Sequence, residues 1–184
     1  MVNTTHSLPA PTNEPIREYR PGTDETARLQ ERIDALSNEC PEIPCIVSGR
    51  ELTTGRIREV RCPHDHGKVL ARYHEATPEV IDAAVEGARV AWREWSETPW
   101  EERLAIFRRA ADLLAGPRRA LLNAATMLGQ SKNAFQAEID SACELIDFWR
   151  FNVHYAWQLY AEQPESGPGM WNAVELRPLE GFVF

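Results

Sequence analysis

The sequence lacks the short motifs that mark most enzyme active sites. It contains no G-x-G-x-x-G dinucleotide turn, no P-loop, no H-E-x-x-H zinc helix and no G-x-S-x-G nucleophile elbow. Its histidines are scattered, and His64, His66 and His74 lie in or near predicted strand turns, where a solvated surface histidine is the usual case. The residues alone therefore assemble no catalytic site, and they predict an α/β domain with several amphipathic helices.

Long apolar runs are lacking too. No stretch approaches the roughly 20 apolar residues of a membrane-spanning helix. Residues 1–22 contain no apolar segment typical of a signal peptide, and they carry acidic side chains that mitochondrial transit peptides largely avoid. We therefore expect a soluble, cytoplasmic protein with no membrane contact.

Basic residues are fewer than acidic residues in this sequence. The 184 residues include 20 Lys and Arg against 28 Asp and Glu, a formal net charge of −8. A nucleic-acid binder needs a concentrated basic surface, whereas acidic residues are interleaved with the local arginine clusters here. This balance predicts no nucleic-acid partner, and the length and apolar content suffice for one domain with a core.

Only four cysteines occur, and an intracellular protein keeps them reduced. Cys62, His64 and His66 suggest a small zinc site, but their spacing departs from the C-x-x-C pattern and Pro63 stiffens the segment. Ordinary packed or surface residues are the better interpretation, so no metal site is predicted. Cys143 falls on the apolar side of a long helix, where we expect a small buried hydrophobe rather than a nucleophile.

Residues 1–42 are predicted to form an irregular N-terminal arm followed by a short helix. The arm, residues 1–22, is rich in Pro, Thr, Asn and Ser. Thr23 can cap a helix whose first turn carries Asp24 and Glu25, where acidic side chains interact favourably with the helix dipole.

Residues 43–184 form the second predicted unit. Turn residues separate short apolar runs between 43 and 74, which predicts antiparallel strands joined by hairpins. Helix starts are predicted at Thr77-Pro78 and at a capping box over Thr98–Glu101. The remaining expected elements are a helix over Arg118 to Met127 ended by Gly129, a long helix capped by Ser131 and running to about Glu162, a strand over Trp171 to Arg177, and an apolar, strand-like run over 180–184.

One stretch, Thr126 to Trp157, carries the clearest helical periodicity. Glu138 lies at the flank of its apolar stripe, close to Trp149, whereas other acidic residues of the stretch fall on the far side. A carboxylate at the edge of a buried aromatic face is a candidate functional group. The stripe recurs at spacings of three and four residues and consists of Phe135, Ile139, Ala142, Ile146, Trp149, Val153 and Trp157.

Three segments resemble the aldehyde dehydrogenase family, and together they extend the resemblance over residues 43–184. The first is Val60 to Leu70 with its P-H-D-H and V-L, the second is the helix pair from Ala91 to Ala115, and the third is Thr126-Met-Leu-Gly-Gln-Ser-Lys132 followed by Gln136-Ala-Glu-Ile-Asp140 and Glu144 to Asn152. The third segment is similar to the L-glutamate γ-semialdehyde dehydrogenase branch, also called 1-pyrroline-5-carboxylate dehydrogenase. Arg177-Pro-Leu-Glu-Gly-Phe-Val183 fits the segment that follows it in that branch.

The resemblance implies the N-terminal part of an aldehyde dehydrogenase fold, truncated, with β-hairpins followed by a helical layer that packs on a Rossmann-like domain. It also implies an enzyme that uses NAD to oxidise glutamate γ-semialdehyde to glutamate in proline degradation and that is a homo-oligomer when full length. The family's nucleotide-binding turn, catalytic cysteine and general-base glutamate match no residue here. We therefore predict no catalytic or cofactor-binding residue, and we expect an inactive N-terminal fragment.

Two substrate-binding residues follow from the resemblance. Glu138 matches an acidic position that faces the substrate channel, where it would engage the α-amino group of the aldehyde or a water beside it. The alternative for Glu138 is a partly solvated carboxylate paired with a nearby basic group. Phe135 is expected to line the same channel, and so can Trp149, although core packing is the better interpretation for Trp149.

Two other roles are alternatives for the chain as a whole. An interaction module would bind a partner through the apolar run Phe182 to Phe184 and through its helix faces, by β-augmentation. A small zinc protein would use Cys62, His64 and His66. If the resemblance holds, a missing sheet and its helices would cover much of the apolar surface, so we expect the isolated chain to be marginally stable, aggregating or molten.

Overall fold

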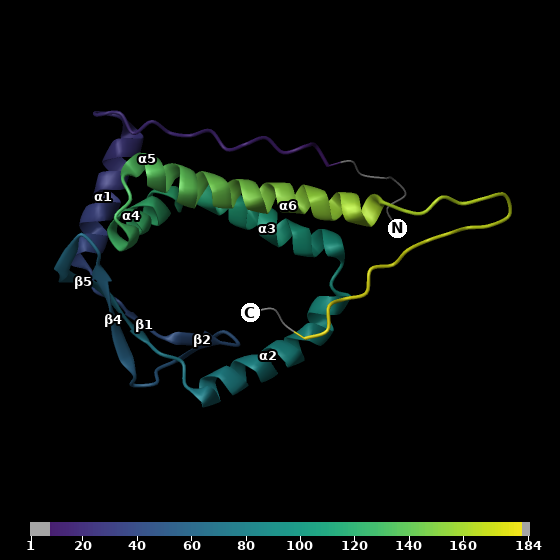
Figure 1. Cartoon of the computed structure of the whole chain (residues 1–184), viewed down its shortest axis with the longest axis horizontal. Coiled ribbons are helices and arrows are strands. Elements are labelled where there is room, and N and C mark those ends of the chain that lie inside the picture. Colours follow the sequence, from purple (N-terminus) through teal and green to yellow (C-terminus); the bar gives the residue numbers. More distant parts are fainter. Residues whose placement is uncertain (1–7, 182–184) are drawn as a thin grey trace.

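The computed structural model describes residues 8–181, and Figure 1 shows their arrangement. Two long helices, α3 and α6, lie side by side, α1 and the strands stand at one end of this pair, and α2 runs along the opposite side. In chain order the elements are α1 (Asp24–Asn38), β1 (Glu42–Ile43), β2 (Cys45–Val47), β3 (Arg50–Leu52), β4 (Ile57–Cys62), β5 (Asp65–His74), α2 (Pro78–Glu97), α3 (Trp100–Ala115), α4 (Arg119–Gln130), α5 (Ala134–Ala137), the π-helical segment η1 (Glu138–Cys143) and α6 (Glu144–Ala161).

The strands form two small sheets. β4 and β5 pair antiparallel, and β2 and β3 form a second antiparallel pair, which confirms the predicted hairpins. β1 adds to β5 in parallel, so the larger sheet has the order β1-β5-β4. The division into residues 1–42 and 43–184 stays a prediction, although β1 straddles that boundary and α1 packs against α4.

Thr23 and Thr77 stand immediately before α1 and α2 as predicted, although the Thr23 side chain makes no capping hydrogen bond, whereas the caps predicted at Thr98 and Ser131 differ. Thr77 caps α2 as predicted, because its hydroxyl accepts a hydrogen bond from the backbone N–H of Val80. The capping box predicted at Thr98 is wrong: Pro99 precedes α3, and the Thr98 hydroxyl donates to the carbonyl of Glu94, at the end of α2.

Ser131 is not the cap of the long helix. It follows the last residue of α4, Gln130, which is one residue beyond the predicted stop at Gly129, and its backbone is left-handed at φ 58°. Asn133 caps the next helix instead, and it exchanges two hydrogen bonds with Gln136, one in each direction. The pattern Asn-x-x-Gln supplies both halves of a capping box, which Ser131 cannot do because Ala134 stands three residues after it.

The core lies between α3 and α6. Ala111 and Leu114 of α3 pack on Ala142 and Ile146, and all four side chains are buried. The two alanines leave room at this contact for the larger Leu114 and Ile146 side chains to pack between the helices. The predicted end of the long helix is confirmed, because α6 ends at Ala161.

Phe135 departs from the predicted stripe. It is 57% exposed, whereas Ala142, Ile146 and Val153 are buried. The physical reason is the π-helical segment over Glu138–Cys143, which inserts an extra residue into one turn. This insertion rotates the residues before it by about 100° relative to those after it, so a stripe with α-helical spacing breaks there.

Two extended segments flank the helices. The arm, residues 8–22, contains no helix or strand, as predicted, and lies along α6, where Asn13 and Glu14 donate hydrogen bonds to Asp147. The strand predicted over Trp171 to Arg177 is wrong: that segment is extended but pairs with no strand in the described part of the chain. A β-prone sequence without a partner strand cannot form a ladder. The predicted run over 180–184 falls largely on residues outside those described.

Apolar side chains are left exposed on α2 and on the C-terminal segment. No residue of α2 is buried, and Trp171 is 90% exposed. Within residues 8–181 no helix has both the length and the apolar character needed to cross a membrane.

We expect the isolated chain to self-associate at micromolar concentration and to bind a dye for apolar surface such as ANS, because stable monomers rarely expose large apolar patches. Sedimentation velocity measures the association. Replacing Val90, an exposed apolar residue of α2, with Lys should reduce it, whereas Glu86→Lys on the same helix should not. A monomer that unfolds in one sharp thermal transition would contradict this expectation.

Candidate functional site

Glu138 lies at the centre of a buried polar cluster. It is 0% exposed and is the first residue of η1. One carboxylate oxygen accepts from the backbone N–H of Arg17 at 2.8 Å and from Arg119. The other accepts from the Tyr19 hydroxyl at 2.8 Å, from Asn123 at 2.8 Å and from Arg119 Nε at 3.2 Å. Glu138 is therefore paired with a basic group, as the alternative interpretation held, but it is fully buried rather than partly solvated.

Arg119 is the cationic partner of this carboxylate. It is the first residue of α4, it is 1% exposed, and it donates hydrogen bonds to both carboxylate oxygens of Glu138. It also donates to the carboxylate of Glu14 and to the carbonyl of Pro15, 2.7 Å away. A planar guanidinium with five donors suits such a site, because it can saturate several acceptors in a fixed geometry.

Glu14 extends the cluster to the surface. Its carboxylate accepts from Arg119 with one oxygen and from Arg150 with the other. The N-terminal arm thus contributes a carboxylate, a backbone carbonyl, a backbone N–H and a phenol to one network. Because a buried ion pair needs such additional hydrogen bonds to offset its desolvation, the arm completes the cluster.

The charges of the pair reinforce each other. Burial works against ionisation of Glu138, but hydrogen bonds from Arg119, the Arg17 N–H and Tyr19 hold the pKa of its carboxyl below the ordinary value. Burial likewise opposes the charge of Arg119, yet Glu138 and Glu14 raise the pKa of its guanidinium. The cluster is therefore an ionised pair at neutral pH.

The pKa values of the Tyr19 phenol and the Cys143 thiol are both raised, which keeps both side chains neutral at neutral pH. Burial, followed by the hydrogen bond and negative charge of Glu138, raises the pKa of the Tyr19 phenol to about 12. Burial and the charge of Glu138 raise the pKa of the Cys143 thiol to about 11. Cys143 is thus a buried neutral thiol, and since the thiolate is the nucleophilic form, it is unsuited to attack a carbonyl.

The π-helical segment explains why Cys143 touches this cluster. Its Sγ lies 3.8 Å from a carboxylate oxygen of Glu138, five residues earlier, and 3.3 Å from Arg119 Nη2. In a π-helix residues five apart stack on one face, whereas in an α-helix they diverge. The segment therefore brings Glu138 and Cys143 together against Arg119.

Phe135, the other predicted substrate residue, lies outside the cluster. Its ring is more than half exposed on α5, whereas Glu138 faces α4 and the arm. The structure does not bring the two predicted residues together on one surface. Their roles in substrate binding stay predictions.

The residues considered for zinc do not assemble a metal centre. The Sγ of Cys62 lies 3.3 Å from His64 Nε2, while His64 Nδ1 lies 2.9 Å from the Ser131 hydroxyl. Across residues 8–181, no three His, Cys, Asp or Glu side chains stand close enough together to hold a metal ion. The contacts of His64 link the β4–β5 hairpin to the end of α4.

Sequence reasoning missed the residues that surround Glu138. Arg119, Asn123, Tyr19 and Glu14 come from segments 15 to 124 positions away in sequence. Helical periodicity identifies which face of one helix is apolar, but it carries no information about which distant donor meets that face. The one available signal was a single acid beside an apolar stripe.

We expect Arg119→Met to lower the free energy of unfolding by about 3–5 kcal/mol, because it leaves a buried carboxylate without its cation. Urea denaturation followed by circular dichroism measures the change. The double variant Arg119→Met/Glu138→Gln should be less destabilised than the single variant, since no charge is then left unpaired. The matched control, Arg118→Met at the neighbouring exposed arginine, should stay within about 0.5 kcal/mol of the parent. Equal losses at positions 118 and 119 would contradict the role given to Arg119.

Alkaline pH should weaken the fold through Tyr19. Its pKa rises from 10.0 to about 12 on folding. The neutral phenol therefore contributes stability that is fully present below pH 10 and is lost as pH rises from 10 to 12. Tyr19→Phe should flatten the decline in unfolding free energy over this range. Tyr155→Phe, at an exposed tyrosine, is the control and should leave the decline unchanged. An unaltered pH dependence in Tyr19→Phe would count against the role given to the Tyr19 phenol. All variants are made in a Cys143→Ala background, which removes a thiol that titrates in an overlapping range.

Comparisons with known proteins point to one family. The model of the Aldehyde dehydrogenase family matches residues 51–184. The delta-1-pyrroline-5-carboxylate dehydrogenase of Agaricus bisporus is 49% identical over 181 residues, and a probable enzyme of the same name from Schizosaccharomyces pombe is 47% identical over 179. These matches cover 97% and 96% of this chain but only 33% of each relative. The chain therefore spans about a third of the length of these curated relatives.

Solved structures agree. The delta-pyrroline-5-carboxylate dehydrogenase of Mycobacterium tuberculosis matches with a TM-score of 0.95 and 46% identity, over 98% of this chain and 34% of that one. The same enzyme has been solved with NAD, and the family uses NAD. Residues 8–181 contain no glycine-rich turn between a strand and a helix N-terminus that would fit the cofactor's phosphates, so no NAD-binding residue is assigned among them. In sequence and in fold, the chain belongs to the aldehyde dehydrogenase family.

Proposed function

We propose that this chain acts as the N-terminal part of an NAD-dependent L-glutamate γ-semialdehyde dehydrogenase, which oxidises glutamate γ-semialdehyde to glutamate in proline degradation. The observation that carries the proposal is the structural match at a TM-score of 0.95 to a delta-pyrroline-5-carboxylate dehydrogenase, over 98% of the chain. The curated relatives that carry this enzyme's name add 42–49% identity. In the complete enzyme, NAD would accept the hydride of the aldehyde.

Within such an enzyme these residues position rather than react. Cys143 is buried with a raised thiol pKa, so it does not supply a nucleophile. α3 and α6 would form a rigid layer beside the substrate, and the isolated chain would not turn over. Its small-molecule partner is the aldehyde, and a homo-oligomer is proposed for the full-length enzyme.

Phe135 is proposed to contact the substrate directly, because its ring is already accessible. Direct contact between Glu138 and a substrate α-amino group has a structural requirement. The Arg17 N–H and the Tyr19 hydroxyl, both from the arm, donate hydrogen bonds to this carboxylate. Residues of the arm must therefore move away from Glu138 before a ligand can reach it. With the arm in place, Glu138 would act by holding α4, η1 and the arm together.

The cellular location is proposed to be the cytoplasm. Relatives from Dictyostelium discoideum and Rattus norvegicus carry the word mitochondrial in their names, so a tagged protein imaged in cells would decide between the two compartments.

A second candidate is a non-catalytic interaction module. The observation that favours it is the exposed apolar surface of α2 and Trp171. The predicted edge, Phe182 to Phe184, lies outside the described residues. The experiment below separates the two functions, because only an enzyme part supports turnover.

We propose a chimera in which residues 1–184 replace the matching third of the Mycobacterium tuberculosis enzyme, and we expect this chimera to be active. Identity of 46% and the same backbone should let the two parts pack. NADH formation with glutamate γ-semialdehyde should stay within about tenfold of the parent, whereas residues 1–184 alone should form none.

Two variants sharpen this test. Phe135→Ala in the chimera should raise KM with little change in kcat if the ring contacts the substrate. Leu159→Ala, at an equally exposed residue near the far end of α6, is the matched control. A chimera that is folded and binds NAD but does not turn over would refute the proposed function.

A further inference from the structure

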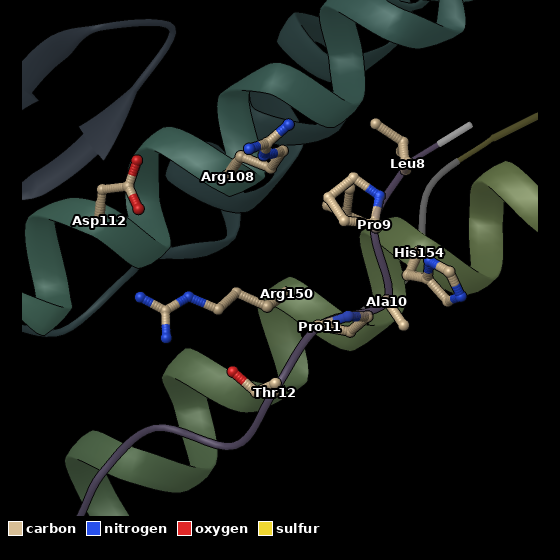
Figure 2. A pocket seen from close by; sticks show the side chains of 10 residues that line it. Leu8, Pro9, Ala10, Pro11, Thr12, Arg108, Asp112, Arg150 and His154 are labelled. Atoms are coloured by element: carbon tan, nitrogen blue, oxygen red, sulfur yellow. The ribbon is translucent and has the colours of Figure 1, made fainter. Parts of the chain in front are cut away.

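A second polar site lies apart from the Glu138 cluster. A cavity of about 260 Å³ opens between the N-terminal arm, α3 and α6. Figure 2 shows the arm running past it, with Arg108 and Asp112 of α3 on one side and Arg150 and His154 of α6 on the other. Neither Phe135 nor Glu138 lines this cavity.

The cavity presents charges of both signs. Arg108 and Asp112 are four residues apart on α3, so they lie on the same helix face. Within residues 8–181, neither side chain makes a hydrogen bond or ion pair. Arg150 uses Nη1 to bind Glu14, which leaves its remaining N–H groups available. The site therefore offers guanidinium donors and a carboxylate acceptor around one space.

This combination selects the ligand's chemistry. A simple anion would be attracted by Arg108 but repelled by Asp112, and a simple cation would meet the reverse. A molecule with a carboxylate and an ammonium group satisfies both, since guanidinium groups bind carboxylates with paired hydrogen bonds. The size agrees: the volume equals roughly nine waters of about 30 Å³ each, so a molecule with about that many heavy atoms fits.

The arm supplies the apolar part of the wall. Leu8, Pro9 and Pro11 line the cavity together with Val153, which is buried on α6. Such a surface suits a short aliphatic side chain better than a further charge. We propose that this cavity binds a small α-amino acid as its zwitterion, with the carboxylate on Arg108 and Arg150 and the ammonium on Asp112. This site is independent of the proposed enzymatic function, because its occupation requires no reaction.

Binding here would also stabilise the docked arm. The wall residues 8–12 continue directly into residues 13–19, which hold Asp147, Arg119 and Glu138. A ligand that contacts the arm only in its docked position shifts the equilibrium toward that position. The Arg17 N–H, which donates to Glu138, should then exchange with solvent more slowly.

Equilibrium dialysis with labelled L-alanine tests the proposal, and it uses the monomeric fraction of residues 1–184 whose helix content circular dichroism has verified. Binding is expected in the millimolar range, with weaker competition from acetate alone or ethylammonium alone than from unlabelled L-alanine. Arg108→Gln and Asp112→Asn should each weaken binding by about fivefold or more. Arg109→Gln, at an adjacent exposed arginine that does not line the cavity, should leave it unchanged.

Hydrogen exchange of residues 13–19, read by mass spectrometry, gives the second measurement and should slow with L-alanine in the parent but not in Asp112→Asn. Acetate that competes as well as L-alanine, an equal loss in Arg109→Gln, or no binding at all would each overturn the proposal. None of these readouts depends on turnover, so their failure is distinct from failure of the chimera.

Discussion

The buried pair of Arg119 and Glu138 is the interaction on which the helical layer depends. Removing two charges from water costs several kcal/mol per ion, and their attraction offsets this only when further hydrogen bonds satisfy the remaining donors and acceptors. Here those partners come from α4, from η1 and from the arm. The network therefore requires these three segments to be in place together, which couples an arm without regular structure to the order of the helices.

The π-helical segment is the local device that makes the pair possible. It breaks the helical phase between α5 and α6, so that Glu138 and Cys143 point to one side while Phe135 is left exposed. Extra-residue turns of this kind interrupt the α-helical ladder and are frequent at functional sites. In this chain the interruption separates an accessible aromatic ring from a buried carboxylate that the sequence places only three residues away.

Membership of the aldehyde dehydrogenase family gives the exposed surfaces a context. The chain spans about a third of its relatives, and the apolar faces of α2 and the C-terminal segment face solvent in the described structure. The helical layer and the arm, in contrast, are held together within this chain by the core between α3 and α6 and by the Glu138 cluster. These internally packed segments are the ones proposed above to form a wall beside the substrate.

The sequence by itself determined the family resemblance, the paired hairpins, the Thr77 cap, the end of α6 and the singular position of Glu138. These depend on local patterns: turn residues, capping chemistry and apolar spacing. Only the tertiary structure decided that Glu138 is buried on Arg119, that Ser131 ends a helix rather than starting one, and that residues 171–177 form no strand. Each of these depends on a partner distant in sequence or on a backbone phase change, and helical periodicity encodes neither.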